Sequence, residues 1–295
     1  MLKSKVLLQI DSDKHASSFD SIVAVDSGVD QLLTHANVAT EDIRNIVHGA
    51  MFTRSPADLK RTAIFFGGSD VAATEAMVAA ASDCFFDTMR VSIMSDPNGS
   101  NTTAAAAVLC AQRHLDFTDK TIVILAGTGP VGQRIAKIIG GLNSAAELRI
   151  CSRQQEKSQA VVDALFESGI ETTSKLVAST TTSPDQTLEI IGGADVVFAA
   201  GAAGIELLDG RWSTTNVKIL VDLNAVPPSG IANIGIMDKG QERDGAICYG
   251  AIGVGGLKMK IHKQAIKSLF ESNDLVLDTE AIYQIGLHLE QEPTL

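Results

Sequence analysis

The chain has 295 residues, of which 45% are hydrophobic, and it carries a formal net charge of −11. This length and composition predict one large domain or two ordinary ones and exclude a largely disordered chain. The negative charge argues against non-specific nucleic-acid binding, and no apolar run reaches the roughly 18 residues that a membrane helix needs.

The first part of the chain repeats a pattern of buried strand, glycine-bearing turn and helix. Strands are predicted at 5–10, 62–68 and 90–96. The strand at 62–68 leads into an alanine-rich helix, and the strand at 90–96 leads into a turn and a helix with Asn and Thr near its start.

A second series of strands opens at 121–126 and continues through 148–151, 194–200 and 218–222. Continuous Val, Ile and Leu runs are typical of strands that are buried on both faces of a parallel sheet. Strands that alternate with helices predict an α/β fold.

The polar stretch at 116–120 separates the two series. It predicts a first domain over 1–117 and a second over 118–254. The last residues, from about 255 to 295, have a helical and polar-faced pattern, and we expect them to pack back on the first domain.

The second series begins with a glycine motif, Gly127-x-Gly129-x-x-Gly132. It follows a buried strand and opens an apolar-periodic helix, the context in which this spacing binds a dinucleotide pyrophosphate at the helix N-terminus. The alternative is a glycine turn of an α/β protein that binds nothing.

The next strand ends in Ser152 and Arg153, with Lys157 one helical turn later. An NAD site carries an acidic residue here for the ribose 2′-hydroxyl, whereas a hydroxyl and a guanidinium suit a 2′-phosphate. The residues therefore predict NADP as cofactor. The alternative is an exposed basic helix start.

Three further turns, at 65–70, 96–103 and 198–204, follow strands at positions where α/β proteins bind ligands, although each is equally consistent with an ordinary turn.

Lys258 and Lys260 are predicted in a glycine-rich turn beside a helix start. Because they are two residues apart, at most one faces a ligand, and both could be solvated.

Neither cysteine nor histidine spacing predicts a metal. The six histidines form no metal-ligand pair, so we expect no metal. The four cysteines form no C-x-x-C pair and are expected to be buried thiols in a reducing cytoplasm.

Longer motifs resemble one known family. The chain is similar to the NADP-dependent methylene-tetrahydromethanopterin dehydrogenases of methylotrophic bacteria, which also act on methylene-tetrahydrofolate. The resemblance covers nearly the whole chain and rests on "FDSIVAVDSG", "TAIFFGGSD", "PNGSNTTAAA", "LAGTGPVG", "SRQQEK", "AGAAGIELL", "DLNAVPPSGI", "GAIGVGGLKMKIH" and "LFESNDLVLDTEAIY".

The resemblance implies two α/β domains with parallel sheets, one of them a Rossmann-type NADP-binding domain, with a cleft between them. It also implies a tetrahydropterin substrate and a homo-oligomer, a trimer or a hexamer. The cleft lysine of the family corresponds to Lys258, and the expected substrate contacts are Phe19, Asp20, Asn101, Thr102, Thr103 and Leu257. The expected cofactor contacts are Gly127, Thr128, Gly129, Pro130, Val131, Gly132, Ser152, Arg153, Lys157, Ala200, Gly201 and Asn224.

The family's chemistry transfers a hydride from a methylene bridge to NADP⁺ and leaves a methenyl cation. No proton moves, so no acid–base pair is needed, and the protein mainly positions two flat rings. Two alternatives stay open, an NADP-dependent dehydrogenase of a small hydroxy acid such as shikimate and a non-catalytic NADP(H)-sensing module. The preference for the methanopterin or the folate substrate and the direction of flux also stay open.

Overall fold

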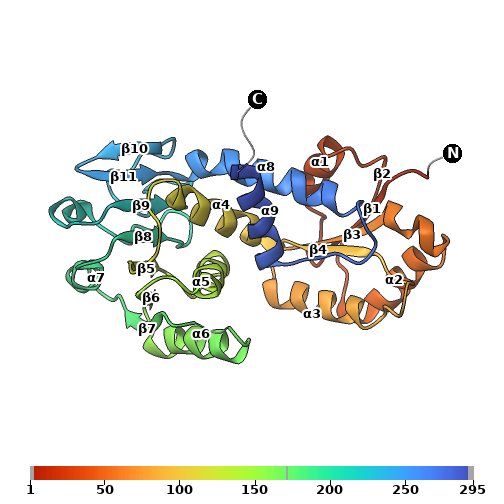
Figure 1. Cartoon of the computed structure of the whole chain (residues 1–295), viewed down its shortest axis with the longest axis horizontal. Coiled ribbons are helices and arrows are strands. Elements are labelled where there is room, and N and C mark those ends of the chain that lie inside the picture. The colour runs from red at the N-terminus through yellow and green to blue at the C-terminus, as the bar shows by residue number, and fades with distance from the viewer. Residues whose placement is uncertain (1–2, 171, 292–295) are drawn as a thin grey trace. The chain divides into compact units, whose positions relative to one another are not determined.

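The computed structural model describes residues 3–170 and 172–291. These residues form two compact units (Figure 1). Unit 1 contains the chain up to Thr102 and from Met259 onward, and unit 2 contains Thr103–Lys258.

The units divide within helices, and not at the predicted boundaries of 117/118 and about 254/255. Helix α4 (Ser100–Gln112) and helix α8 (Ala251–Ser268) each begin in one unit and end in the other. A continuous helix has no polar break where it passes from one unit to the next, so the sequence gives no sign of the division.

Unit 1 is built on a five-stranded parallel sheet with the order β12-β4-β3-β1-β2. Read along the chain, this is the doubly wound order 2-1-3-4-5, in which the order reverses between β1 and β3. Ligands bind such sheets outside the carboxyl ends of the strands at that reversal. The strands are β1 (Val6–Asp11), β2 (Gln31–His35), β3 (Thr62–Gly67), β4 (Ser92–Ser95) and β12 (Val276–Leu277).

Helices cover both faces of the unit 1 sheet, with α2 and α3 on one face and α1 on the other (Figure 1). The chain moves in one direction across the sheet from β1 to β2 and in the opposite direction from β2 to β3. Because both crossovers are right-handed, their helices lie on opposite faces of the sheet. Alternation along β3 then sends Ile64 and Phe66 into the core beneath α2 and α3. The helices are α1 (Ser18–Asp26), α2 (Ile43–Met51), α3 (Val71–Ser82) and α9 (Thr279–Gln291).

Unit 2 is built on a seven-stranded sheet with the order β10-β11-β9-β8-β5-β6-β7. Without β10, this is the Rossmann order 3-2-1-4-5-6, and all of those strands are parallel. The predicted Rossmann-type fold is thereby confirmed. The strands are β5 (Thr121–Leu125), β6 (Glu147–Ser152), β7 (Lys175–Thr180), β8 (Val196–Ala199), β9 (Ile219–Asp222), β10 (Lys239–Arg243) and β11 (Ala246–Tyr249).

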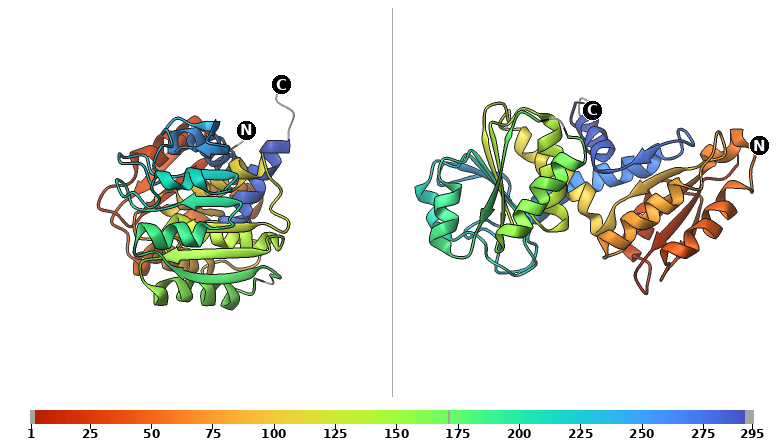
Figure 2. Two further views of the ribbon diagram at one scale, coloured as in Figure 1. Left: turned by 90° about the vertical axis from the view of Figure 1, so that its left-hand side faces the viewer. Right: turned by 90° about the horizontal axis from the view of Figure 1, so that it is seen from below.

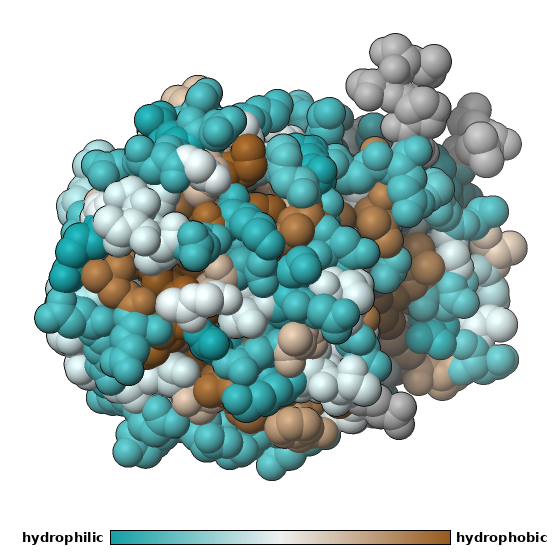
Figure 3. Space-filling view, turned by 60° about the vertical axis from the view of Figure 1, so that its left-hand side comes forward, coloured by the Kyte–Doolittle hydropathy of each residue, from teal (hydrophilic) through white to brown (hydrophobic). Residues whose placement is uncertain are grey.

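Three helices of unit 2 connect its strands, α5 (Pro130–Leu142), α6 (Gln155–Glu167) and α7 (Pro184–Ile191). The helices α5 and α6 lie on one side of the sheet, as the right-hand view of Figure 2 shows. In the view of Figure 3, hydrophilic residues predominate, and hydrophobic residues show in several separate groups between them.

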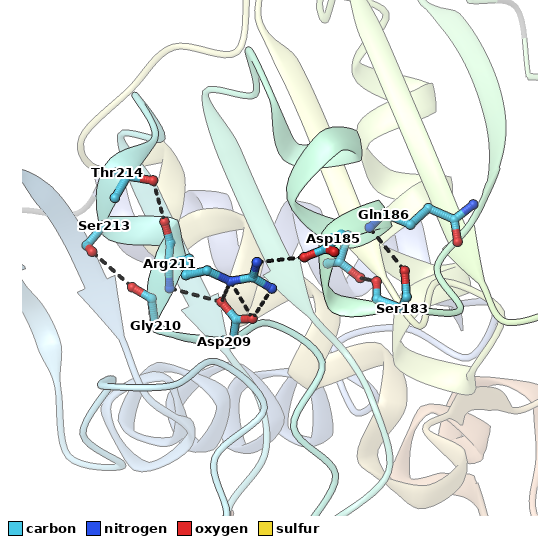
Figure 4. A network of polar contacts seen from close by, with 9 residues as sticks. Ser183, Asp185, Gln186, Asp209, Gly210, Arg211, Ser213 and Thr214 are labelled. Atoms are coloured by element: carbon cyan, nitrogen blue, oxygen red, sulfur yellow. Dashed lines mark hydrogen bonds and ion pairs between the residues drawn. The ribbon is translucent and has the colours of Figure 1, made fainter.

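An ion network links the short helix after β8, Gly210–Thr214, to the start of α7 (Figure 4). The guanidinium of Arg211 donates hydrogen bonds to Asp209 and, at 2.6 Å, to Asp185. The hydrogen bonds from the Arg211 side chain to Asp209 lower the pKa of the Asp209 carboxyl. Because the network is solvent-exposed, its contribution to stability is small, and we assign it only the tethering of the crossover.

Candidate functional site

The glycine motif of unit 2 joins β5 to α5 at the reversal of the strand order. A Cβ atom at Gly132 would lie 2.6 Å from the Cα of Gly127, and one at Gly127 would lie 2.8 Å from Ile150. Both contacts are shorter than real side chains allow. These two glycines therefore let the first turn of α5 pack directly against the end of β5.

Gly129 differs from its neighbours because the fold does not require it. Its φ of −76° and ψ of 168° are open to any residue, and a Cβ there would make only ordinary contacts, at 3.5 Å and beyond. Its missing side chain keeps space free in front of the α5 N-terminus. Backbone N–H groups at a helix start attract anions, so a pyrophosphate fits this space.

Other predicted cofactor residues lie in the same turn. Pro130 and Val131 form the first positions of α5, where proline costs no hydrogen bond. The carbonyl of Thr128 accepts a hydrogen bond of 2.8 Å from Gln133, which braces the turn against the helix.

The predicted 2′-phosphate residues lie at the end of β6. Ser152 is the last residue of the strand and is buried, whereas Arg153 and Lys157 are exposed. Within the described part of the chain, neither cation has an acidic partner. The two cations are thus available to an anion beside the glycine turn.

The loops after β8 and β9 contain Ala200, Gly201 and Asn224. The amide of Asn224 accepts from the backbone N–H of Gly204 at 3.2 Å and donates to the carbonyl of Pro228 at 2.8 Å. It therefore ties the two loops together and shapes the edge of the site. Direct contact between Asn224 and a nicotinamide ring stays a prediction.

Asp222, the last residue of β9, holds the loop that follows this strand. Its carboxylate accepts backbone hydrogen bonds from Asn224 at 3.0 Å and Ile231 at 3.1 Å. Burial raises the pKa of this carboxyl, while the backbone donors oppose that rise. Apart from the position of Asp222 at a strand end, no pattern in the sequence indicates this role.

The carboxyl ends of the unit 1 strands form a polar edge. Asp11, at the end of β1, is buried and accepts from the backbone N–H groups of Asp13 at 2.9 Å and Ser17 at 3.0 Å. The carboxylate of Asp13 in turn accepts from the backbone and hydroxyl of Ser69, after β3. These hydrogen bonds therefore hold the turn after β1 against the turn after β3, at the reversal of the strand order.

Phe19 and Asp20 lie in the first turn of α1, whose N-cap Ser17 accepts a hydrogen bond from the Asp20 N–H at 3.2 Å. The Phe19 side chain is 48% exposed, so much of its ring faces outward. Next to them lies the fully buried His262 of α8. The sequence indicates only that His262 belongs to no metal-ligand pair, and no pattern in it predicts this placement.

Asn101 and Thr102, two predicted substrate contacts, start α4 and are buried. Their backbone N–H groups and the Thr102 hydroxyl donate to Asp96, and the Asn101 side chain bonds Ser95 and Thr279. In this structure both residues stabilise the start of α4 through these hydrogen bonds. Thr103 is partly exposed, and its substrate contact, like theirs, stays a prediction.

The expected glycine-rich turn around Lys258 is helical, which corrects the sequence interpretation. Helix α8 begins at Ala251, so Leu257, Lys258 and Lys260 all lie on it. A Cβ at Gly253 would lie 1.8 Å from the Asp238 carbonyl, so packing of the helix start requires glycine. Tertiary packing here overrides the low helix propensity of glycine.

Lys258 and Lys260 point in different directions, as predicted, because two residues turn the helix by about 200°. Lys258 is partly buried and Lys260 is exposed. Lys258 shares its face of the helix with His262, four residues later. That spacing is the one sequence signal that could have drawn attention to the histidine.

The described residues contain no group of three or more acidic, histidine or cysteine side chains that could hold a metal ion. Among the helices of the described chain, none is both long and apolar enough to cross a membrane.

Comparison with known proteins adds sequence evidence to this geometry. Residues 18–98 match a family model described as methylene-tetrahydromethanopterin dehydrogenase, N-terminal. The chain is 40% identical to the bifunctional protein MdtA of Methylorubrum extorquens, over 97% of this chain and 99% of that protein. It is 31% identical to the NAD(P)-dependent methylenetetrahydromethanopterin dehydrogenase of the same organism, over 94% of this chain and 95% of that protein.

Solved structures support the fold alone. Shikimate 5-dehydrogenase from Listeria monocytogenes, in complex with shikimate and NAD, has a TM-score of 0.55 at 13% identity, covering 96% of each chain.

The different roles of the glycines give a paired prediction. Gly129→Val should leave the fold intact but reduce NADP⁺ binding at least roughly 100-fold, because the side chain occupies the path of the pyrophosphate. Gly132→Ala should instead destabilise the protein, since its Cβ meets backbone at 2.6 Å. Isothermal titration calorimetry and thermal unfolding measure the two effects. Normal affinity in a folded Gly129→Val protein would contradict the placement of the cofactor.

Proposed function

The chain belongs to the methylene-tetrahydromethanopterin dehydrogenase family, and on this premise we propose that it oxidises a methylene-tetrahydropterin with NADP⁺. The proposed substrates are methylene-tetrahydromethanopterin and methylene-tetrahydrofolate, and the product is the methenyl cation. Similarity to two family members over nearly their full length supports this reading. The likeness to a shikimate dehydrogenase concerns fold alone and does not favour a hydroxy-acid substrate.

The observation that carries the proposal is the pairing of an open glycine turn with two exposed cations. Gly129 leaves room for a pyrophosphate, and Arg153 and Lys157 follow the next strand without an acidic partner in the described chain. A guanidinium can bind a phosphate through two parallel hydrogen bonds. This arrangement suits NADP, whose 2′-phosphate distinguishes it from NAD.

The bound cofactor supplies a nicotinamide ring that accepts the hydride. The protein has to bring this ring and the methylene carbon to about 3–3.5 Å and hold both rings flat against each other. In our proposal Ala200 and Gly201 form the floor under the nicotinamide, since neither has a bulky side chain. Phe19 offers an exposed ring, and Asp20 a carboxylate, to a pterin with N–H donors.

The bonds balance without proton transfer. The C–H bond of the methylene bridge breaks, its electron pair leaves with the hydrogen, and the positive charge spreads over the two flanking nitrogens. Carboxylates such as Asp11 and Asp20 favour the developing cation, whereas a charged Lys258 close to it would oppose the reaction. We therefore propose that Lys258 acts by orienting a ring through hydrogen bonds.

We further propose that the enzyme works in the cytoplasm as a homo-oligomer, a trimer or a hexamer. All four cysteines are free thiols, as expected in a reducing compartment. The oligomer rests on the family resemblance, and light scattering after size-exclusion chromatography measures it.

The proposed function is tested by following NADP⁺ reduction with methylene-tetrahydromethanopterin and methylene-tetrahydrofolate side by side. The proposal predicts turnover with at least one of them and none with shikimate. An NADP(H)-sensing module would bind NADPH yet give no turnover with any tetrahydropterin, which would overturn the proposal.

Arg153→Ala should weaken NADP⁺ far more than NAD⁺. The lost contact is a charge-assisted hydrogen bond to the 2′-phosphate alone, worth roughly 1.5–3 kcal/mol, or about 10- to 100-fold. Steady-state KM values for the two cofactors measure the difference, and NAD⁺ serves as the internal control. Equal losses for both cofactors would show that Arg153 has a structural role instead.

Lys258→Met should lower the turnover number roughly 10-fold or more while the KM for NADP⁺ changes less than about 2-fold, because orientation of the reacting rings is lost. Lys260→Met is the matched control on the same helix, and its effect should be small. If the ammonium did no more than repel the forming cation, Lys258→Met would accelerate oxidation and contradict the orienting role.

A further inference from the structure

His262 lies inside unit 1, directly behind the two α1 residues proposed to receive the substrate. Its side chain is fully buried, and its ring stacks on Phe65 of β3 with centroids 5.7 Å apart and planes at 22°. On another side it meets the ring of Phe19, at a centroid distance of 6.2 Å and an angle of 43°. The imidazole thus forms the middle of an aromatic stack that ends in an exposed ring.

The same imidazole faces a carboxylate. Its Nε2 lies 4.0 Å from Oδ1 of Asp20, within reach of an ion pair but longer than a hydrogen bond. The Asp20 side chain is itself mostly buried. A movement of about 1 Å would bring the two atoms to the roughly 3 Å of a charge-assisted hydrogen bond.

A second carboxylate shares this environment. A Cβ placed on Gly67, at the end of β3, would lie 3.6 Å from Oδ2 of Asp11 and 3.6 Å from Oδ2 of Asp20. Asp11 already accepts two backbone hydrogen bonds, which hold it in place. Asp20 has another carboxylate nearby, so like-charge repulsion favours turning it away from this edge unless a donor holds it.

A residue that only filled the space over Phe65 would not need ring nitrogens. Burying an imidazole costs free energy that a phenyl ring of similar size would not incur. The nitrogen directed at Asp20 gives the histidine a use that a phenylalanine could not replace.

We propose that His262 is a positioning residue of the substrate site, which holds the carboxylate of Asp20 and the ring of Phe19 in the orientation that receives the pterin. This inference rests on the proposed function. The Phe19 ring is one stacking surface for the flat pterin, and Asp20 accepts from its N–H donors. His262 acts through both residues and touches neither the methylene bridge nor the cofactor.

Two substitutions separate the nitrogen from the packing. His262→Phe keeps the stack on Phe65 and removes the donor to Asp20. If the 4.0 Å contact shortens to a charge-assisted hydrogen bond when the pterin binds, its loss should raise the KM for the tetrahydropterin roughly 10-fold, while the KM for NADP⁺ changes less than about 2-fold. His262→Gln returns an amide donor and should recover part of the loss, which also keeps the test valid if the phenyl ring packs poorly.

The double variant tests whether His262 acts through Asp20. Asp20→Ala alone should raise the tetrahydropterin KM, and adding His262→Phe to it should change that KM by less than about 2-fold, because alanine has no oxygen to accept the hydrogen bond. His48→Phe is the matched control. The ring of His48 also contacts a phenylalanine of unit 1, Phe52, at a centroid distance of 5.3 Å and an angle of 55°, and its replacement should leave both KM values unchanged.

If the wild-type enzyme is active, each outcome supports or overturns the proposed role of His262. An unchanged tetrahydropterin KM in folded His262→Phe, or equal rises for both substrates, would overturn the role of His262. So would full additivity of the KM effects of His262→Phe and Asp20→Ala. Failure of the wild-type enzyme to reduce NADP⁺ with any tetrahydropterin would instead overturn the proposed function, so the two failures are distinguishable.

Discussion

The close approach of helix α5 to strand β5 is the constraint on which the cofactor site depends. Because Gly132 has no side chain, the first turn of the helix rests on the backbone of Gly127, where a Cβ would come within 2.6 Å. That contact aims the free N–H groups of the helix start at the reversal of the strand order. Gly129 leaves the space in front of them open, and Arg153 stands at the end of the next strand. This arrangement suits an anionic dinucleotide and does not depend on any side chain proposed to contact the substrate.

The ligand-facing turns of the two sheets have the same position in the fold but carry groups of opposite charge. Both units bring their turns together outside the carboxyl ends of parallel strands. In unit 2 these turns carry backbone N–H groups and cations, whereas in unit 1 they carry Asp11, Asp13 and Asp20. The first set suits a phosphorylated cofactor. The second suits a ring that has N–H donors and becomes positively charged as hydride leaves. The net charge of −11 says nothing about this division, because a ligand responds to the local groups.

Local motifs explain what the sequence could predict. The glycine turn and Arg153 lie within one strand–helix–strand stretch, so spacing alone placed them, and continuous apolar runs identified the parallel strands. The contacts that depend on distant segments could not be predicted. His262 meets Phe65 and Asp20 only after α8 returns to unit 1, and no local pattern distinguishes it from any other histidine. The helix through the glycines after Ala251 was missed for a related reason, because its stability comes from packing and not from propensity. The charged strand β10 lacks the apolar run on which the strand prediction relied.

The enzyme moves a hydride directly from carbon to carbon, and the transferred hydrogen does not exchange with solvent. The most direct test uses a tetrahydropterin whose methylene bridge carries two deuterium atoms, oxidised with NADP⁺ in ordinary water, followed by mass spectrometry of the reduced cofactor. Direct transfer predicts one deuterium in each molecule of NADPH formed, and no deuterium when unlabelled substrate reacts in heavy water. Loss of the label to water, or uptake of deuterium from heavy water into NADPH, would contradict direct hydride transfer.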